Sequence, residues 1–365
     1  MKKIIYICSY HMYTTLATIQ AQRAPVGPPV STFGTAFTQL TTIASLGYGQ
    51  NALYVNQFVG GMCCDSTGQY IVLCDQNEGK VFLSQNSGAG WSILTSSNIP
   101  NLSGTYGPCG CCCSSSGQYM YIALNNKGMY YNSNYGAGSW TVMNSGNNAR
   151  TITCSSDGST LIAQCFAGGI MKSTNYGTSW AKITTLADTV GTKCFTVSMS
   201  TDGTKMCTYC TSNTTAAAAQ YGVWYSSDSG TTWTNLYASM TLSLNNIKQL
   251  DSGNILISTY VGTYGVYLWN GTTWTGILPN TSAYTNTSPI VYAFDATPDG
   301  SIILCGNIYT SAYAYLFLSK DSGATFSKVT SMGTATWQNI LVSKDGKSLF
   351  VTGSGATKSD LFRST

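Results

Sequence analysis

One eight-residue segment returns along the chain and constrains its fold more than any other feature. It reads Ser226-Ser227-Asp228-Ser229-Gly230-Thr231-Thr232-Trp233, with close copies at 319–326, 173–180, 133–140 and 84–91. Asp or Asn in this position hydrogen-bonds its own backbone, Gly supplies a positive φ, and the final aromatic residue buries its ring. The segment, called the box turn below, therefore predicts a hairpin turn that leads into a strand.

A second turn alternates with the box turn and separates two apolar runs each time. It occurs seven times, at 65–68, 114–117, 155–158, 200–203, 251–253, 297–300 and 343–346. A third strand follows each of these hairpins, and in six units a box turn then leads to a fourth strand opened by Trp91, Trp140, Trp180, Trp233, Trp274 or Phe326. Four strands per unit, repeated every roughly 40 to 50 residues, predict the blades of a β-propeller.

These repeats resemble the Asp-box (BNR) repeat of sialidase-like and photosystem-assembly-factor-like propellers. The resemblance covers residues 31–365 and implies an all-β, seven-bladed propeller with four-stranded blades. The superfamily includes sialidases, other glycosidases, sorting receptors and a photosystem assembly factor, so the fold leaves the function open.

The seventh unit stops before its fourth strand. Its third strand, 360–363, runs into the C-terminus where a box turn should begin, whereas residues 31–40 match the box turn and strand at 173–182. We expect the N-terminal strand to pair with 360–363 and to close the ring, which removes two exposed sheet edges.

The fifth unit carries a shorter Asn270-Gly271 turn in place of the box turn. This pair still favours a hairpin.

Composition is consistent with one domain at 30–365, preceded by an extension at 1–29. Only 8% of the 365 residues are charged, and Gly, Ser, Thr, Asn and Tyr are abundant. Such a composition favours strands and tight turns. The net charge of +4 comes from scattered lysines and three arginines, Arg23, Arg150 and Arg363. Since no basic stripe forms, we expect no nucleic-acid partner.

The N-terminal extension has two interpretations that the sequence leaves open. Basic Lys2 and Lys3 precede a short apolar run, and residues 19–21 offer a cleavage site. These features are typical of a secretory signal. Polar residues interrupt the run, which favours an N-terminal arm instead, and a proline-containing linker follows at 22–30. No apolar run is long enough to suggest a membrane span.

Five Asn-x-Ser/Thr sequons suggest a secreted, cell-surface or virion protein, although a chain this rich in these residues produces some by chance. The candidate glycosylation sites are Asn101, Asn213, Asn270, Asn280 and Asn286.

The fourteen cysteines fall mainly in predicted buried strands. In such strands a thiol packs as a small apolar group. Cys64, Cys113 and Cys154 occupy equivalent places before the first turn of their units. The cluster at 109–113 lacks a second Cys-x-x-Cys pair or a nearby histidine, so we expect no metal there and no cofactor elsewhere.

The catalytic groups of a hydrolase are missing from the sequence pattern. The sialidases of this superfamily use an arginine triad, a tyrosine–glutamate pair and an acid/base aspartate, but the chain has only three arginines, one of them in the N-terminal extension, and one glutamate, Glu78. Its single histidine, His11, lies outside the repeats, which excludes a Ser-His-Asp site in the propeller. Asp75 and Asp295 remain the glycosidase candidates only if their blades converge; otherwise each caps a loop.

Tyrosine is the remaining indication of a binding function. The chain has 25 tyrosines, and several of them, including Tyr264, are expected outside the strands.

In a four-stranded blade the first and third turns emerge on one face, here called the turn face. The second turn and the blade-to-blade connection emerge on the other, the loop face, which receives the long insertions at 96–108, 212–220, 279–288 and 307–314.

We therefore predict a non-catalytic scaffold that binds a protein or glycan partner through the loop face. The candidate contacts are Tyr106, Arg150, Tyr284, Tyr309 and Tyr313. A simple solubilising role for the tyrosines is the competing interpretation. Two alternative functions are a glycan-binding or glycoside-hydrolysing propeller and a homo-oligomeric or fibrous assembly built through residues 1–29.

Overall fold

The computed structural model describes the strands, most turns and part of the connections. The described residues are 33–41, 43, 46, 61–75, 78–102, 107–125, 127–144, 149–165, 169–184, 186, 192–212, 222–237, 244–259, 264–279, 291–307, 315–333, 335–354 and 359–365. The chain divides into two units, Met1–Phe33 and Gly34–Thr365. The second unit is a β-propeller.

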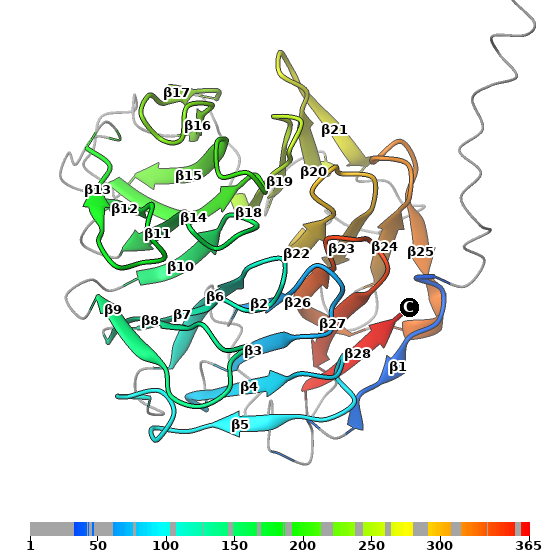
Figure 1. Ribbon diagram of the computed structural model, residues 1–365. Helices are drawn as coiled ribbons and strands as arrows, with labels where there is room; N and C mark the ends of the chain where they lie inside the picture. The colour runs from blue at the N-terminus through cyan, green and yellow to red at the C-terminus, as the bar shows by residue number, and fades with distance from the viewer. Residues whose placement is uncertain are drawn as a thin grey trace, which may run out of the picture. The chain divides into compact units, whose positions relative to one another are not determined.

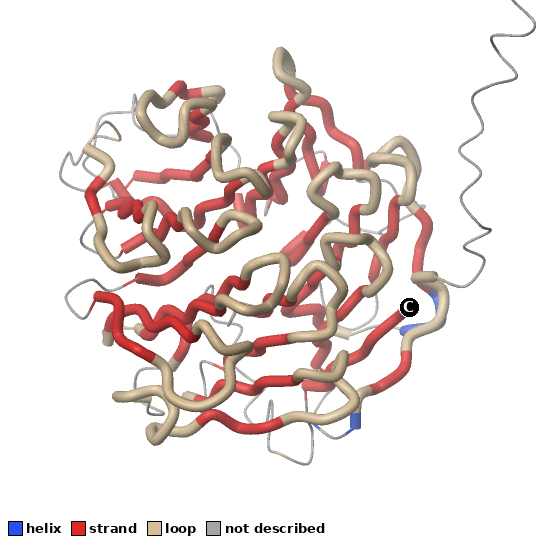
Figure 2. Tube along the Cα trace, viewed as in Figure 1, coloured by secondary structure: helices blue, strands red, loops and turns tan. Residues whose placement is uncertain are grey.

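Seven four-stranded antiparallel sheets form the propeller, as the sequence predicts (Figures 1 and 2). Blade 1 contains β2 (Met62–Cys64), β3 (Ile71–Asp75), β4 (Lys80–Ser84) and β5 (Ser92–Leu94). Blade 2 contains β6 (Pro108–Cys113), β7 (Met120–Leu124), β8 (Gly128–Asn132) and β9 (Thr141–Asn144). Blade 3 contains β10 (Ala149–Cys154), β11 (Leu161–Cys165), β12 (Gly169–Ser173) and β13 (Ala181–Lys182).

The next three blades repeat this order. Blade 4 contains β14 (Thr192–Met199), β15 (Met206–Ser212), β16 (Gly222–Ser226) and β17 (Thr234–Asn235). Blade 5 contains β18 (Leu244–Gln249), β19 (Ile255–Thr259), β20 (Tyr264–Trp269) and β21 (Trp274–Pro279). Blade 6 contains β22 (Val291–Ala296), β23 (Ile303–Asn307), β24 (Leu316–Ser319) and β25 (Ser327–Val329), followed by the 3-10 helix η2 (Thr330–Met332).

Blade 7 is assembled from both ends of the propeller sequence. It contains β26 (Thr336–Val342), β27 (Leu349–Ser354), β28 (Ser359–Ser364) and, from the other end, β1 (Thr38–Gln39). In Figure 1 the blue β1 lies beside the red β28, with Thr38 opposite Arg363 and Gln39 opposite Phe362. The predicted closure by terminal strands is therefore confirmed.

The details of this closure correct the sequence alignment by one residue. Gly34 donates its amide proton to Ser364 Oγ at 2.9 Å, as Gly177 does to Ser173 Oγ at 3.0 Å. The serine of the seventh box turn therefore comes from the C-terminus, and Phe37, not Thr38, takes the place of Trp180. The predicted match of Ser31 with Ser173 is wrong by one position.

The box turns share one hydrogen-bond pattern. In blade 4, Ser226 Oγ accepts from the amide of Gly230 at 2.8 Å, and Asp228 Oδ1 accepts from that of Thr232 at 2.8 Å. The indole of Trp233 donates to the carbonyl of Gly230 at 3.0 Å. Ser229 has a φ of 57°, and its equivalents in four other blades are also positive. These contacts explain why hydroxyl, carboxyl or amide, glycine and aromatic groups recur at fixed spacing.

A chain of hydrogen bonds joins the first turns of successive blades. The amide of Ser66 donates to Ser115, that of Ser115 to Ser156 and that of Ser156 to Thr201, at 2.7–2.9 Å. Further links run from Thr201 to a carboxylate oxygen of Asp251, from Asp251 to Pro298 and from Asp345 back to Ser66. Pro298 has no N–H to donate, which leaves it only an acceptor in this chain. The first turns therefore bind the blades to one another on the turn face.

The core consists of apolar layers between neighbouring blades. The first strands pack against one another in the order β2, β6, β10, β14, β18, β22 and β26, and β26 returns to β2. Second strands such as β3, β7, β11 and β19 are buried along their whole length. This burial explains their continuous apolar sequence. Tyr264, expected outside the strands, instead begins β20 and packs edge-on against Tyr267.

Candidate functional site

The expected loop-face site is described only in part. Tyr106, Tyr284, Tyr309 and Tyr313 lie outside the described residues. Arg150 lies at the start of the first strand of blade 3, as predicted, and is half-buried. Its carbonyl oxygen lies 2.8 Å from the position that a Cβ on Gly110 would occupy. Glycine at 110 therefore allows β6 and β10 to approach closely beside this candidate contact.

Two of the five sequons are described, and they occupy different surroundings. The Asn101 amide donates to the Tyr130 hydroxyl at 3.0 Å, and Asn101 has a φ of 66°. Asn270 Oδ1 accepts from the amides of Thr272 and Thr273 in the short turn of blade 5. Asn213, Asn280 and Asn286 lie outside the described residues.

Asp157 and Asp202 on the turn face each bind their own turn. Asp202 accepts from the Ser200 hydroxyl and from the amide and hydroxyl of Thr204, and these hydrogen bonds lower its pKa to about 2. The pKa of Asp157 is lowered mainly by the Ser155 hydroxyl and further by Ser159. Such carboxylates stay ionised and hydrogen-bonded to hydroxyl and amide groups of the turn. They therefore stabilise the turns and are poorly placed to transfer protons to a substrate.

The two glycosidase candidates have separate structural partners. Asp75 Oδ1 accepts from the amide of Glu78 at 3.1 Å at the end of β3. Asp295 forms an ion pair of 2.7 Å with Lys248 and accepts from the amide of Val342 at 2.9 Å, so it joins blades 5, 6 and 7. Each contact supports the loop-capping or structural interpretation of these carboxylates.

Cysteines line the first and second strands as expected, but one departs from simple packing because Cys210 is disulfide-bonded. Ten described cysteines are free thiols, and nine of these are buried. Within the described ranges, no group of three or more His, Cys, Asp or Glu side chains is arranged to hold a metal ion. Nor does any described helix have the length and hydropathy to cross a membrane.

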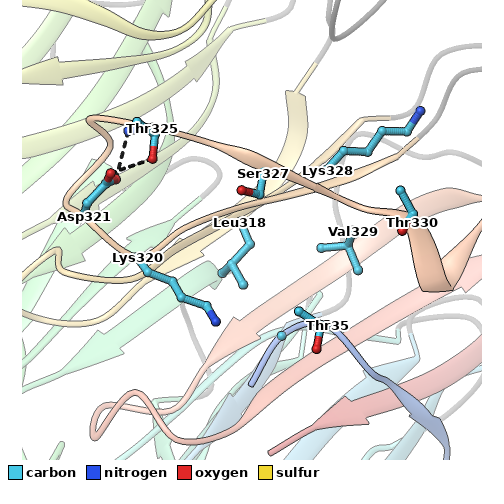
Figure 3. Close-up of a pocket in the computed structure, with 10 residues that line it drawn as sticks. Thr35, Leu318, Lys320, Asp321, Thr325, Ser327, Lys328, Val329 and Thr330 are labelled. Carbon is cyan, nitrogen blue, oxygen red and sulfur yellow. Dashed lines mark hydrogen bonds between the residues drawn. The ribbon is translucent and has the colours of Figure 1, made fainter. Parts of the chain in front are cut away.

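A hollow of about 290 Å³ lies between blade 6 and the segment ahead of β1 (Figure 3). Lys320 and Thr35 line it together with Leu318 and Val329, and Asp321 on its rim is held by Thr325. The repeat pattern could not reveal this hollow, because its walls come from opposite ends of the sequence.

Comparison with known proteins establishes similarity of fold. No protein-family model matches the chain, and no curated protein sequence matches it. A structure of YCF48 bound to D1 peptide is 14% identical, with a TM-score of 0.62 over 90% of this chain and 96% of that chain. The Swd1 propeller of Myceliophteria thermophila is 9% identical, with a TM-score of 0.58 over 86% and 98%. Hydrazine synthase of Kuenenia stuttgartiensis is 12% identical, with a TM-score of 0.61 over 87% and 99%.

Proposed function

We propose that this chain is a non-catalytic interaction scaffold that binds a protein partner through its loop face. The main observation behind this proposal is that these carboxylates already accept structural hydrogen bonds. Asp157 and Asp202 accept from the backbone of their own turns, and Asp295 of blade 6 accepts from the backbone of blade 7. The chain of hydrogen bonds between first turns further gives the turn face an architectural role. The loop face then offers the variable connections for recognition.

The similar propellers support this proposal as precedents for the fold. One of them was solved with a bound peptide, so a ring of this kind can present a peptide-binding surface. Another is an enzyme, hydrazine synthase, so fold similarity alone does not decide between binding and catalysis. The partner side chains would meet Tyr106, Tyr284, Tyr309, Tyr313 and Arg150. Tyrosine suits such contacts because it buries a large, rigid ring while its hydroxyl remains hydrogen-bonded.

We further propose an extracellular, cell-surface or virion location, motivated by the sequons and the signal-like start of the chain. Secretion of the full chain from a eukaryotic host, followed by mass analysis before and after glycosidase treatment, tests this location. Glycan at Asn101, Asn213, Asn280 or Asn286 would support the proposal. Retention inside the cell as an unglycosylated chain with residues 1–21 intact would contradict it.

A binding experiment tests the loop-face site directly. The full chain is immobilised, a partner is captured by cross-linking from its source cells, and the dissociation constant is then measured with purified partner. Alanine at the four candidate tyrosines should weaken binding several-fold without changing the melting temperature. Lys320→Ala and Lys347→Ala are the turn-face controls. Loss of binding in these controls, with the tyrosine variants unaffected, would reverse the assignment of faces.

Lys344 is unsuitable as a control because its ammonium group donates to Ser115 Oγ at 3.1 Å, from blade 7 to blade 2.

The rival enzymatic function is tested by incubating the purified protein with a panel of chromogenic glycosides. Turnover that disappears in Asp75→Asn or Asp295→Asn, with folding preserved, would overturn the scaffold proposal. Comparing native mass with and without residues 1–29 tests the third function, assembly through the N-terminal arm.

A further inference from the structure

In blades 4 and 6 the second-last residue of the first strand contacts the last residue of the next blade's first strand. Ser198 Oγ, one residue before the end of β14, accepts from the amide of Gln249, the last residue of β18, at 2.9 Å. Asp295, one residue before the end of β22, accepts in the same way from Val342, the last residue of β26. This position therefore forms a direct contact between first strands.

In blades 1, 2 and 3 the residues at these strand positions are cysteines, and their side chains contact one another. Cys63 of β2 hydrogen-bonds with Cys111 and Cys113 of β6, and Cys112 of β6 with Cys154 of β10. Cys63 and Cys113 belong to the apolar cluster between blades 1 and 2, whereas Cys112 and Cys154 belong to the cluster between blades 2 and 3. Adjacent residues of β6 thus point into different interfaces, as strand geometry requires.

The backbones of β6 and β10 come close beside the second thiol pair. A Cβ built on Gly110 would lie 3.2 Å from Thr151 Cα. Close packing of β6 against β10 is compatible with a disulfide, whose Cα atoms lie about 4.4–6.8 Å apart. Cys112 and Cys154 each keep 8% of their surface exposed, so neither residue is completely enclosed.

Hydrogen bonding and burial shift the pKa values of the two thiols in opposite directions. The hydrogen bond from Cys112 is the main reason why the pKa of Cys154 is lowered, and the Lys344 ammonium lowers it further against the effects of burial and Asp157. Burial raises the pKa of Cys112 well above its usual range. Cys154 therefore ionises first and becomes the nucleophile of the pair.

We propose that Cys112 and Cys154 form an oxidation site, at which a peroxide converts the two thiols into a disulfide between blades 2 and 3. The Cys154 thiolate attacks a peroxide oxygen and becomes a sulfenic acid, while the other oxygen leaves as hydroxide. Cys112 sulfur then attacks the Cys154 sulfur, and the sulfenic oxygen leaves as water. The two thiols lose two protons and two electrons, and hydrogen peroxide becomes two molecules of water.

Peptide mapping of the full chain tests this site. The reduced protein is treated with hydrogen peroxide, remaining thiols are alkylated, and a non-reducing digest is analysed by tandem mass spectrometry. We expect a cross-linked peptide pair whose fragments place the bond between Cys112 and Cys154. A bond to Cys113 or Cys165 instead, or oxidation of Cys154 without any cross-link, would overturn the proposal.

Variants distinguish the pair from other cysteines in the same peptides. Cys112→Ser and Cys154→Ser should each abolish the cross-link. Cys165→Ser should retain it, because Cys165 lies at the end of β11 opposite Ala149 and takes no part in the proposed bond. Peroxide should also raise the melting temperature of Cys165→Ser but not that of Cys112→Ser, since only the former gains the inter-blade link. A cross-link that survives in Cys112→Ser would contradict the assignment even without the mass-spectrometric fragments.

Discussion

The amide of Gly34 donates a hydrogen bond of 2.9 Å to Ser364 Oγ, although 330 residues separate them in sequence. This contact completes a box turn whose serine and glycine come from different ends of the propeller. Leu40 extends the junction by donating its amide proton to the carbonyl of Leu361 at 2.8 Å. Ring closure therefore depends on specific hydrogen bonds as well as on strand pairing.

Ser364→Ala should lower the free energy of unfolding by about 1–3 kcal/mol, because the buried Gly34 amide would lose its acceptor. Urea denaturation followed by tryptophan fluorescence measures the change. Thr365→Ala, at an exposed neighbour, is the matched control and should have little effect. Equal stability of the two variants would show that the split turn does not contribute to closure.

Asp251→Ala should lower the free energy of unfolding by about 1–3 kcal/mol, because the amide and hydroxyl of Thr201 would both lose their acceptor. Each of these groups donates to the Asp251 carboxylate at 2.7 Å and so joins the first turns of blades 4 and 5. Ser252→Ala in the same turn is the control. If calorimetry finds the two melting temperatures equal, the chain of turn contacts is not a stabilising feature.

Lys248→Met should lower the free energy of unfolding by about 3 kcal/mol, because a largely buried carboxylate would remain without its cation. That carboxylate belongs to Asp295, the ion-pair partner of Lys248. Chemical denaturation measures this loss, and Lys347→Met at an exposed position is the control. Asp295→Asn should restore part of the stability in the Lys248→Met background. No recovery in the double variant would argue against an uncompensated charge as the cause.

Acid should destabilise the propeller between about pH 4 and pH 2. The Asp202 carboxyl has a folded pKa of about 2, below its value in the unfolded chain, so its stabilising contribution is present above that unfolded value. It is lost as pH falls through the folded pKa. Urea denaturation at a series of pH values should show a smaller acid-induced loss in Asp202→Asn. An unchanged pH dependence would exclude Asp202 as a contributor.

The sequence predicted the number of blades, the order of their strands and the closure by β1, because each depends on local turn chemistry repeated at a regular spacing. The alignment of residues 31–40 with the box turn at 173–182 was wrong by one residue. A contiguous sequence pattern cannot identify Ser364, at the other end of the propeller, as the partner of Gly34. It also missed the contact of Cys112 with Cys154, which depends on how neighbouring blades are staggered. Of the predicted site, Arg150 lies at the expected strand start, while the four tyrosines belong to connections whose lengths follow no repeat.

The most direct test of the closed ring compares thermal unfolding of the full chain with two N-terminal deletions. Removal of residues 1–24 should leave the melting temperature unchanged, because β1 remains paired with β28. Removal of residues 1–43 should lower it by about 5 °C or more, since blade 7 then loses its fourth strand and the Gly34–Ser364 hydrogen bond. A melting temperature that is the same for all three chains would contradict closure of the propeller by its two ends.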